Sequence, residues 1–356
     1  MNKKLVMISI FLLLTVFMVI GCTQEPPETE TYATEEEDLE AQSGPFFFLN
    51  SVMDVKIFDE ENDTEEVRRA ISKEVQRVES LMTMRDLHSD VSKINQNAGI
   101  EPVTIDKDTF EVIERSLYYS EITNGAFDIT VGHLVELWGI GTEDQRLPSQ
   151  DEIDLSLSYI NYKDIELDKE NLSVFLKREG MMIDLGGIAK GYAADRVAAV
   201  LASHDVKSAI INLGGDVYVH GSRENRDFRV GIQNPFSDRG EHMGIYNAKD
   251  KSIVTSGNYE RFFEEDGITY HHILSTTDGY PVQNELVSVT IISDLSIDGD
   301  ALSTAVYAMG IEEGLGLVDR LEDVEAIIIN KDKEVYVSKN VMDFFTISDD
   351  SFKLMN

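Results

Sequence analysis

The chain has 356 residues, of which 42% are apolar, and it carries 66 acidic against 31 basic residues, which leaves a formal net charge of −35. This excess of negative charge argues against a nucleic-acid partner, because binding a phosphate backbone needs clustered Lys and Arg. A ligand that bears phosphate would be repelled by such a surface, so a site for one needs local positive charge, most simply a metal ion.

The N-terminus predicts export. Lys3 and Lys4 precede a continuous apolar run over residues 5–20, and Gly21 and Cys22 follow. A basic start, an apolar stretch and a small residue before a cleavage point are typical of a secretory signal. The run is also short for a spanning helix, which needs ~20 apolar residues. The VIGC stretch resembles a bacterial lipobox, in which the cysteine is lipidated.

We therefore expect a lipoprotein signal peptide over residues 1–21 and lipid anchoring through Cys22 to the extracytoplasmic face of the cell membrane. An uncleaved anchor helix is the alternative, and it places the rest of the chain on the same side. Cys22 is the only cysteine, so an intrachain disulfide is excluded. Residues 22–44 are acidic and nearly free of large apolar side chains, which predicts a flexible tether.

The folded part is expected over residues 45–345, followed by a C-terminal tail over 346–356. Residues 46–58 are typical of a strand, and residues 64–83 of a helix capped by Thr64. A loop is expected around 89–95 and a second helix over 107–122, capped near Asp106.

Beyond residue 180 the chain turns a corner over 183–196, where an apolar strand, MMI, runs into Asp184 and a helix begins near Ile188 and runs to about His204. From residue 207 the pattern is mostly that of strands. After Asp300 we expect a helix that Gly310 ends, a further helix over 312–321 and a closing hairpin. With no internal repeat, this pattern predicts one α+β domain with a large, mainly antiparallel sheet and flanking helices.

The corner itself has the composition of an anion site. Gly186 and Gly187 allow a tight turn, and Lys190 falls in the first helical turn, where a lysine opposes the helix dipole unless an anion is near. Helix N-terminal amides and a lysine together can hold a phosphate. An ordinary tight turn is the alternative, and the phosphate loop GxxxxGK[ST] is absent.

A second candidate lies where the helix after Asp300 begins. Asp300 and Thr304 are four residues apart, so on a helix they share one face. A carboxylate, a hydroxyl and a nearby backbone carbonyl are hard oxygen ligands that Mg²⁺ accepts. The alternative is an N-capping aspartate followed by an ordinary helical threonine.

Two further stretches carry side chains that suit chemistry. His271 and His272 are adjacent in a strand-like run, so only one of them can face a site, where it could act as a base; the alternative is a histidine packed in the sheet. Phe127 and Trp138 have flat rings that suit stacking on a flavin, although ordinary aromatic core is the alternative. No zinc site is expected, since a third His or Cys at ligand spacing is missing.

Six stretches, in this order, resemble the blocks of the ApbE family, the FAD:protein FMN transferases, over roughly residues 45–340. The blocks are Gly125–Val135 with Trp138-Gly139, Asp184–Gly191, Asn212–Asp216, Thr255–Arg261, His271–Pro281 and Asp300–Ala305. The resemblance implies the T-fold-like α+β domain of that family. It also implies a magnesium-dependent reaction that splits FAD, passes FMN to a Thr or Ser hydroxyl of an acceptor protein in an extracytoplasmic redox system, and releases AMP.

The resemblance also implies roles for individual residues. Magnesium would be held by Gly187, Asp300 and Thr304, and the chemistry would rest on His272 as base with Lys190 and Asp300. The flavin nucleotide would be contacted by Met53, Ala126, Phe127, Asp128, Asp184, Lys190, His272, Ile273 and Leu274.

The chain departs from the family pattern at three places. His133 stands where proline is usual, STTDGYP replaces DPxTGYP after His272, and Arg85 stands where many relatives place an aromatic residue. Two alternatives to the transferase stay open from the sequence: an FAD pyrophosphatase that releases FMN and AMP, and a non-catalytic lipoprotein, with or without bound flavin.

Overall fold

The computed structural model describes residues 46–48 and 51–355. The predicted signal peptide, Cys22 and the predicted tether lie outside these residues. Along the part of the chain that is described, no helix is both long and apolar enough to span a bilayer.

A nine-stranded sheet carries the fold, in the order β1-β2-β6-β7-β10-β13-β14-β15-β17. Neighbouring strands are antiparallel throughout, except that β17 runs parallel to β15. The strands are β1 Phe46–Phe48, β2 Ser51–Ile57, β6 Ser208–Leu213, β7 Asp216–Gly221, β10 Lys251–Gly257, β13 Leu286–Ser293, β14 Glu325–Asn330, β15 Glu334–Val337 and β17 Lys353–Leu354. The predicted α+β class with a mainly antiparallel sheet is confirmed.

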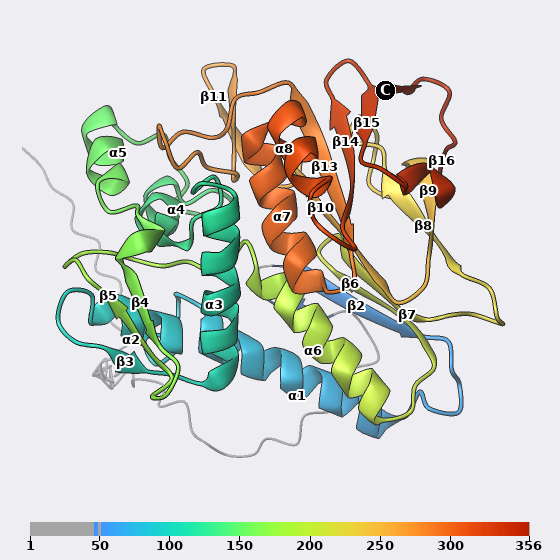
Figure 1. The fold of residues 1–356 in the computed structure, drawn as a ribbon, viewed down its shortest axis with the longest axis horizontal. Helices are drawn as coiled ribbons and strands as arrows, with labels where there is room; N and C mark the ends of the chain where they lie inside the picture. The colour runs from blue at the N-terminus through green and yellow to red at the C-terminus, as the bar shows by residue number, and fades with distance from the viewer. Residues whose placement is uncertain (1–45, 49–50, 356) are drawn as a thin grey trace, which may run out of the picture. The chain divides into compact units, whose positions relative to one another are not determined.

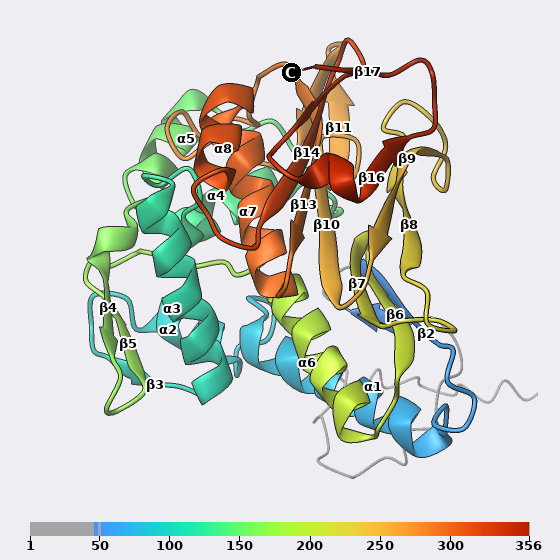
Figure 2. The ribbon, with the colours of Figure 1, turned by 45° about the vertical axis from the view of Figure 1, so that its right-hand side comes forward.

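Both faces of this sheet are covered. Every residue of β13 is buried, and its side chains alternate between two apolar clusters: Val289 and Ile291 join one, Ile292 the other. Figure 1 shows the reason, since helices α1 (Glu65–Met82), α6 (Ala189–Ser203) and α7 (Ser296–Met309) lie on one face and a small sheet lies on the other. That small sheet has the order β16-β9-β8, and Figure 2 shows it turned toward the viewer.

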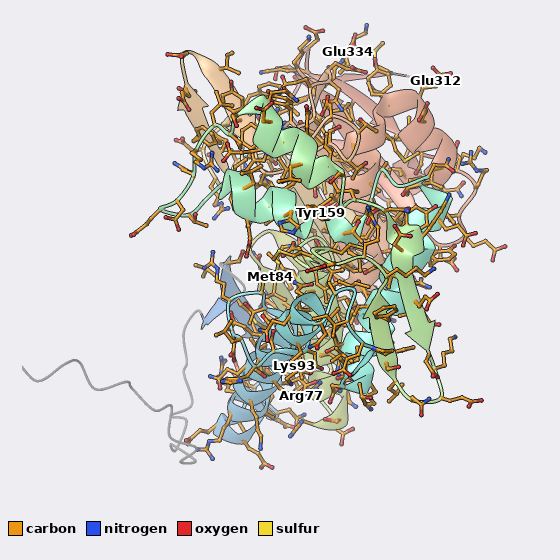
Figure 3. The ribbon with its side chains drawn as sticks, turned by 90° about the vertical axis from the view of Figure 1, so that its left-hand side faces the viewer. Arg77, Met84, Lys93, Tyr159, Glu312 and Glu334 are labelled. Atoms are coloured by element: carbon orange, nitrogen blue, oxygen red, sulfur yellow. The ribbon has the colours of Figure 1, made fainter. Side chains whose placement is uncertain are left out.

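The remaining helices and strands lie outside the nine-stranded sheet. The helices are α2 Asp90–Gln96, α3 Lys107–Ile122, α4 Gly132–Trp138, α5 Gln150–Leu157 and α8 Ile311–Val318, with 3-10 turns at Ile129–Val131, Tyr162–Asp164 and Val341–Asp343. The strands are β3 Val103–Thr104, β4 Ile165–Asp168, β5 Ser173–Leu176, β8 Phe228–Gln233, β9 His242–Ala248, β11 Phe262–Glu265, β12 Ile268–His271 and β16 Phe345–Ile347. Figure 3 shows the side of the molecule that carries α1 and α2, with Arg77 of α1, Lys93 of α2 and Glu312 of α8 labelled.

Three predicted helices, α1, α3 and α6, match the structure to within a residue. Local capping sets the starts of α1 and α3. The Thr64 hydroxyl accepts from the backbone N–H of Val67 at the start of α1, and the Asp106 carboxylate accepts from Asp108 at the start of α3. Four other expectations are wrong. Residues 46–58 form two strands, β1 and β2, paired with each other rather than one strand.

The second correction concerns the loop expected over 89–95, which is helix α2. Ser89 caps it by accepting from the backbone N–H of Ser92, and Val91 and Ile94 are buried at helical spacing. The third concerns residues 181–183, which join no strand ladder. Their backbone is held instead by Asn95, whose side chain donates to the carbonyl of Ile183 at 3.0 Å and accepts from its N–H at 2.8 Å.

The fourth correction concerns α7, which begins at Ser296 and not after Asp300. Asp300 therefore lies inside the helix and is not its N-cap. Residues 346–355, predicted as part of a C-terminal tail, take part in the fold. Strand β16 pairs with β9, β17 pairs with β15, and Phe352 is buried.

Candidate active site

Helices α6 and α7 approach each other closely at Gly191. A Cβ atom at this position would lie 2.2 Å from the carbonyl oxygen of Ser296, so only glycine permits the contact. One turn further along α6, the Asp195 carboxylate accepts from the backbone N–H groups of Ser296 at 2.7 Å and Ile297 at 2.9 Å. Because α7 has no side-chain cap of its own, α6 fixes where α7 begins, and with it the position of Asp300.

Lys190 forms a buried ion pair with two carboxylates at this junction. Its ammonium lies 2.7 Å from Asp300 Oδ1 and 3.0 Å from Asp216 Oδ2, and Asp300 Oδ2 accepts from the backbone N–H of Gly191 at 2.9 Å. Burial lowers the pKa of Lys190, but the charges of Asp216 and Asp300 more than offset this, so the pKa is raised and the lysine stays charged. The anion expected beside Lys190 is thus supplied by the protein itself.

The predicted oxygen ligands lie together. The backbone of Gly187 faces Thr304, since a Cβ on Gly187 would lie 3.8 Å from Thr304 Oγ1. Ser256 on β10 supports the same region, with its hydroxyl 2.8 Å from Ser303 Oγ and 3.5 Å from Thr304 Oγ1. Asp300 and Thr304 therefore share one face of α7, as their spacing predicts, and that face meets the glycine corner.

This donor set fits a hard divalent cation. One buried carboxylate, one hydroxyl and the exposed backbone of a tight turn provide oxygen atoms only, which suits Mg²⁺ better than zinc. Within the described ranges, no three His, Cys, Asp or Glu side chains form a metal-binding group. A cation at this corner would therefore depend on the mixed oxygen ligands around Asp300.

The two histidines face different surroundings, as expected for neighbours in an extended segment. His271 is packed in the core, with Nε2 2.9 Å from the Val282 carbonyl and its ring against Tyr307. His272 lies on the other side, with Nδ1 3.3 Å from the carbonyl oxygen of Arg261. Burial lowers the pKa of His272 to about 3, and the nearby positive charge of Arg261 adds to the effect. Lys190 lowers the same pKa, so His272 lies within electrostatic reach of the ion pair.

Asp184 sits at the start of the corner. Its N–H donates to the carbonyl of Ile129 at 2.8 Å, and its Oδ1 accepts from the N–H of Gly186 at 2.9 Å. Burial raises the pKa of Asp184, while Arg261 and Arg85 act in the opposite direction. Arg85 is exposed, and because its charge lowers the pKa of Asp184, this departure from the family pattern brings positive charge within electrostatic reach of the corner.

The structure places the other predicted nucleotide contacts as follows. Phe127 is buried, with its ring 3.3 Å from where a Cβ of Gly187 would lie. Ala126 and Leu274 are half-buried, whereas the side chains of Met53 and Ile273 are buried in the core. These contacts with a nucleotide stay predictions.

Asp128 is held by the scaffold. Its Oδ1 accepts from the N–H and hydroxyl of Thr130, and its Oδ2 accepts from the N–H of Tyr162 at 2.9 Å. Burial raises its pKa. Since both carboxylate oxygens bond to the chain, Asp128 shapes the loop that carries Ala126 and Phe127.

Trp138 lies in the core and not at the site. Its side chain is fully buried, its ring packs against Phe263, Tyr270 and Tyr280, and its Nε1 donates to the Gly279 carbonyl at 2.8 Å. The aromatic-core interpretation holds for this residue.

The other two departures from the family pattern join neighbouring segments. His133 Nε2 is 2.5 Å from the Gly180 carbonyl, and its ring stacks on Tyr159, which Figure 3 labels. In the STTDGYP loop, the Thr276 hydroxyl donates to the carbonyl of Gly125 at 2.7 Å. The loop after His272 is therefore held against the loop that carries Phe127.

Sequence reasoning assigned no role to three residues that shape the site: Asp216, Asp195 and Arg261. Asp216 is the last residue of the NLGGD block, and Arg261 ends the TSGNYER block, so both motifs were visible. Only the fold brings Asp216 to Lys190 and Arg261 to His272. Asp195 likewise meets Ser296 across 101 positions of the chain.

Comparison with known proteins covers most of the described region. The sequence model of the ApbE family matches residues 49–328. The chain is similar to an FAD:protein FMN transferase of Klebsiella pneumoniae, with 39% identity over 264 residues, which cover 74% of this chain and 82% of that protein. It is also similar to one of Treponema pallidum, with 32% identity over 295 residues, covering 79% and 81% respectively.

Solved structures agree with this placement. The ApbE protein of Thermotoga maritima superposes with a TM-score of 0.77 at 33% identity, covering 85% of this chain and 98% of that one. The flavin transferase ApbE of Vibrio cholerae gives a TM-score of 0.76 at 26% identity, with the same coverage of both chains.

Proposed function

The chain belongs to the ApbE family, and from this premise we propose that it is a magnesium-dependent FAD:protein FMN transferase of the cell envelope. It moves FMN from FAD to a Thr or Ser hydroxyl of an exported acceptor protein and releases AMP. The observation that carries the proposal is the junction of α6 and α7, where Lys190, Asp300 and Thr304 meet the glycine corner within electrostatic reach of a neutral histidine.

The transfer balances as a single displacement at phosphorus. The acceptor oxygen forms a bond to the phosphorus of the FMN half, the bond to the bridging oxygen breaks, and AMP leaves with that oxygen. The acceptor hydroxyl loses its proton, which needs a base. With Nδ1 of His272 donating to the Arg261 carbonyl, Nε2 carries the free lone pair and takes this proton.

The environment of His272 suits this role. Its lowered pKa keeps the imidazole neutral throughout the neutral range, so the lone pair is available without prior deprotonation. The same low pKa makes it a weak base in the ground state. A bound pyrophosphate, with its negative charge, would raise this pKa again, so that His272 accepts a proton more readily when substrate is present.

Magnesium would be held by Asp300, Thr304 and the backbone carbonyl of Gly187. When bound, it supplies positive charge that neutralises the phosphate oxygens. The chain's own residues then have separate tasks: Lys190 brings positive charge to the same place, and the Gly191 N–H and Asp195 keep Asp300 in position. In a protein with a net charge of −35, this local positive charge is what allows a dinucleotide to bind.

We also propose that Cys22 anchors the protein to the membrane, so that its acceptor is an exported subunit of a redox system. The nearest alternative is an FAD pyrophosphatase, in which water replaces the acceptor hydroxyl. Both enzymes need the same bound FAD and cation, so the site does not separate them. A non-catalytic flavin-binding lipoprotein would not depend on Asp300, Thr304 and His272 together.

The test uses the full-length protein in detergent with FAD, Mg²⁺ and an exported redox protein that bears a surface threonine. We expect a band of the acceptor that is fluorescent on a denaturing gel, lost on adding a chelator and absent when that threonine is replaced by alanine. Free FMN without a fluorescent band would support the pyrophosphatase instead. Unchanged FMN release by Asp300→Ala would contradict both enzymes.

A further inference from the structure

In the proposed reaction Asp300 has to bind both Lys190 and a divalent cation. In the structure its Oδ1 accepts from Lys190 and its Oδ2 from the Gly191 N–H. As a cation ligand it would also have to accept a divalent charge beside the ammonium group of Lys190. Since like charges in a buried site repel strongly, Lys190 must shift away from Asp300 when the cation binds, and it must find another anion to remain buried.

Asp216 is the anion within reach. It follows the Gly214-Gly215 turn between β6 and β7, is buried with 3% of its surface exposed, and its Oδ2 lies 3.0 Å from Lys190. That oxygen makes no hydrogen bond within the described residues, so the ion pair with Lys190 is its compensation. The ammonium group of Lys190 thus neutralises two buried carboxylates, Asp216 and Asp300, at the same time.

The sharing leaves Asp216 short of positive charge. Burial raises the pKa of Asp216, Lys190 lowers it only in part, and the charge of Asp300 raises it further. A movement of Lys190 toward Asp216 would therefore be favourable for Asp216 at the moment when the cation takes over the neutralisation of Asp300.

We propose that Asp216 is a positioning residue that receives Lys190 when a divalent cation binds at Asp300. This inference rests on the magnesium site of the proposed function. It assigns to Asp216 no contact with the cation itself: its effect on cation binding passes through Lys190. The lysine stays in the site in either position, ready to contact phosphate.

The test is a double-mutant cycle on cation affinity. Mg²⁺ is titrated by calorimetry into the full-length protein in detergent, without nucleotide, for the wild type, Asp216→Asn, Lys190→Gln and the double variant. We expect Asp216→Asn to weaken Mg²⁺ binding about 10-fold or more, because Lys190 then stays on Asp300. Lys190→Gln should bind Mg²⁺ at least as tightly as the wild type, since the competing charge is gone.

The decisive comparison is made in the Lys190→Gln background, where adding Asp216→Asn should change the Mg²⁺ affinity by less than about 3-fold. A loss as large as in the wild-type background would overturn the inference, because Asp216 would then act as a plain negative charge. Glu260→Gln is the matched control: Glu260 lies near Asp216 but pairs with Arg239, and its loss should leave the affinity within about 2-fold.

Two outcomes separate this inference from the proposed function. If the wild type binds no Mg²⁺, the magnesium site itself is wrong, and the inference with it. If the wild type binds but Lys190→Gln binds more weakly, Lys190 does not compete for Asp300, and only the inference is refuted. This second result decides the matter even if Asp216→Asn does not fold.

Discussion

Replacing Gly191 with alanine measures how closely α6 and α7 must approach to build the site. The added Cβ would lie 2.2 Å from the Ser296 carbonyl oxygen, where real Cβ atoms keep at least 3.0 Å. The difference of 0.8 Å must be met by backbone, because the obstructing atom is a carbonyl oxygen and not the end of a flexible side chain. The two helices therefore have to move apart.

The cost can be estimated from this movement. If it reaches the side chains in full, the Lys190–Asp300 contact lengthens from 2.7 Å to about 3.5 Å, the limit of a hydrogen bond. Overpacking costs about 1–3 kcal/mol, the weakened charge-assisted bond adds to it, and the better helix propensity of alanine returns up to ~1 kcal/mol. We expect a net loss of about 1–3 kcal/mol in the free energy of unfolding.

Urea denaturation measures this loss, as a lower midpoint at unchanged slope. The control is Gly316→Ala in α8, where an added Cβ meets only the end of the Arg320 side chain at 3.7 Å. This variant should be as stable as the wild type or more stable by up to ~1 kcal/mol. If Gly191→Ala proved as stable as Gly316→Ala, the close approach of α6 and α7 would not be what the structure indicates.

Three further predictions concern Asp195, Asn95 and His272. Asp195→Asn replaces one accepting oxygen with an NH₂ group that cannot accept, which leaves one of the first N–H groups of α7 unpaired. Thermal melting should show a loss of about 1–3 kcal/mol in the free energy of unfolding. An unchanged stability would mean that Asp195 does not cap α7. Asn95→Ala leaves both backbone groups of Ile183 without their partner and should lower the free energy of unfolding by a similar amount. The Ile183 amide hydrogen should also exchange faster than in the wild type, and an unchanged exchange rate would contradict the role given to Asn95. For His272, the folded pKa of about 3 lies below the ordinary 6.5, so its contribution to stability is present above pH 6.5 and is lost as the pH falls toward 3. The difference in unfolding free energy between the wild type and His272→Gln should therefore shift against the wild type on acidification, and a difference independent of pH would show that His272 is not buried as a neutral group.

Much of the secondary structure could be predicted from residues close together in the sequence. The starts of α1 and α3 were predictable because Thr64 and Asp106 cap their own helices, so the information lies within a few residues. Helix α2 is not predictable in this way, because its seven residues hold too few apolar positions to display a helical period. The apolar run 181–183 predicts a strand, but its backbone bonds to the Asn95 side chain, the Arg178 carbonyl and the N–H of Gly132 at the start of α4.

The site was predictable to the extent that its residues share an element. Asp300 and Thr304 lie four apart, so their common face follows from helix geometry. The start of α7 did not follow, because its cap is Asp195 on another helix. The pairing of Lys190 with Asp300 spans 110 positions, and no feature of either stretch alone indicates that the ammonium group is shared with Asp216.

The most direct test of the proposed activity is the ratio of AMP released to acceptor modified. After incubation of the full-length protein with FAD, Mg²⁺ and a threonine-bearing acceptor, AMP is quantified by chromatography and the acceptor by intact mass. We predict one AMP for each acceptor that gains one FMN, and neither product with Asp300→Ala. AMP in large excess over modified acceptor would contradict transfer to a protein hydroxyl, and full activity of Asp300→Ala would contradict the site.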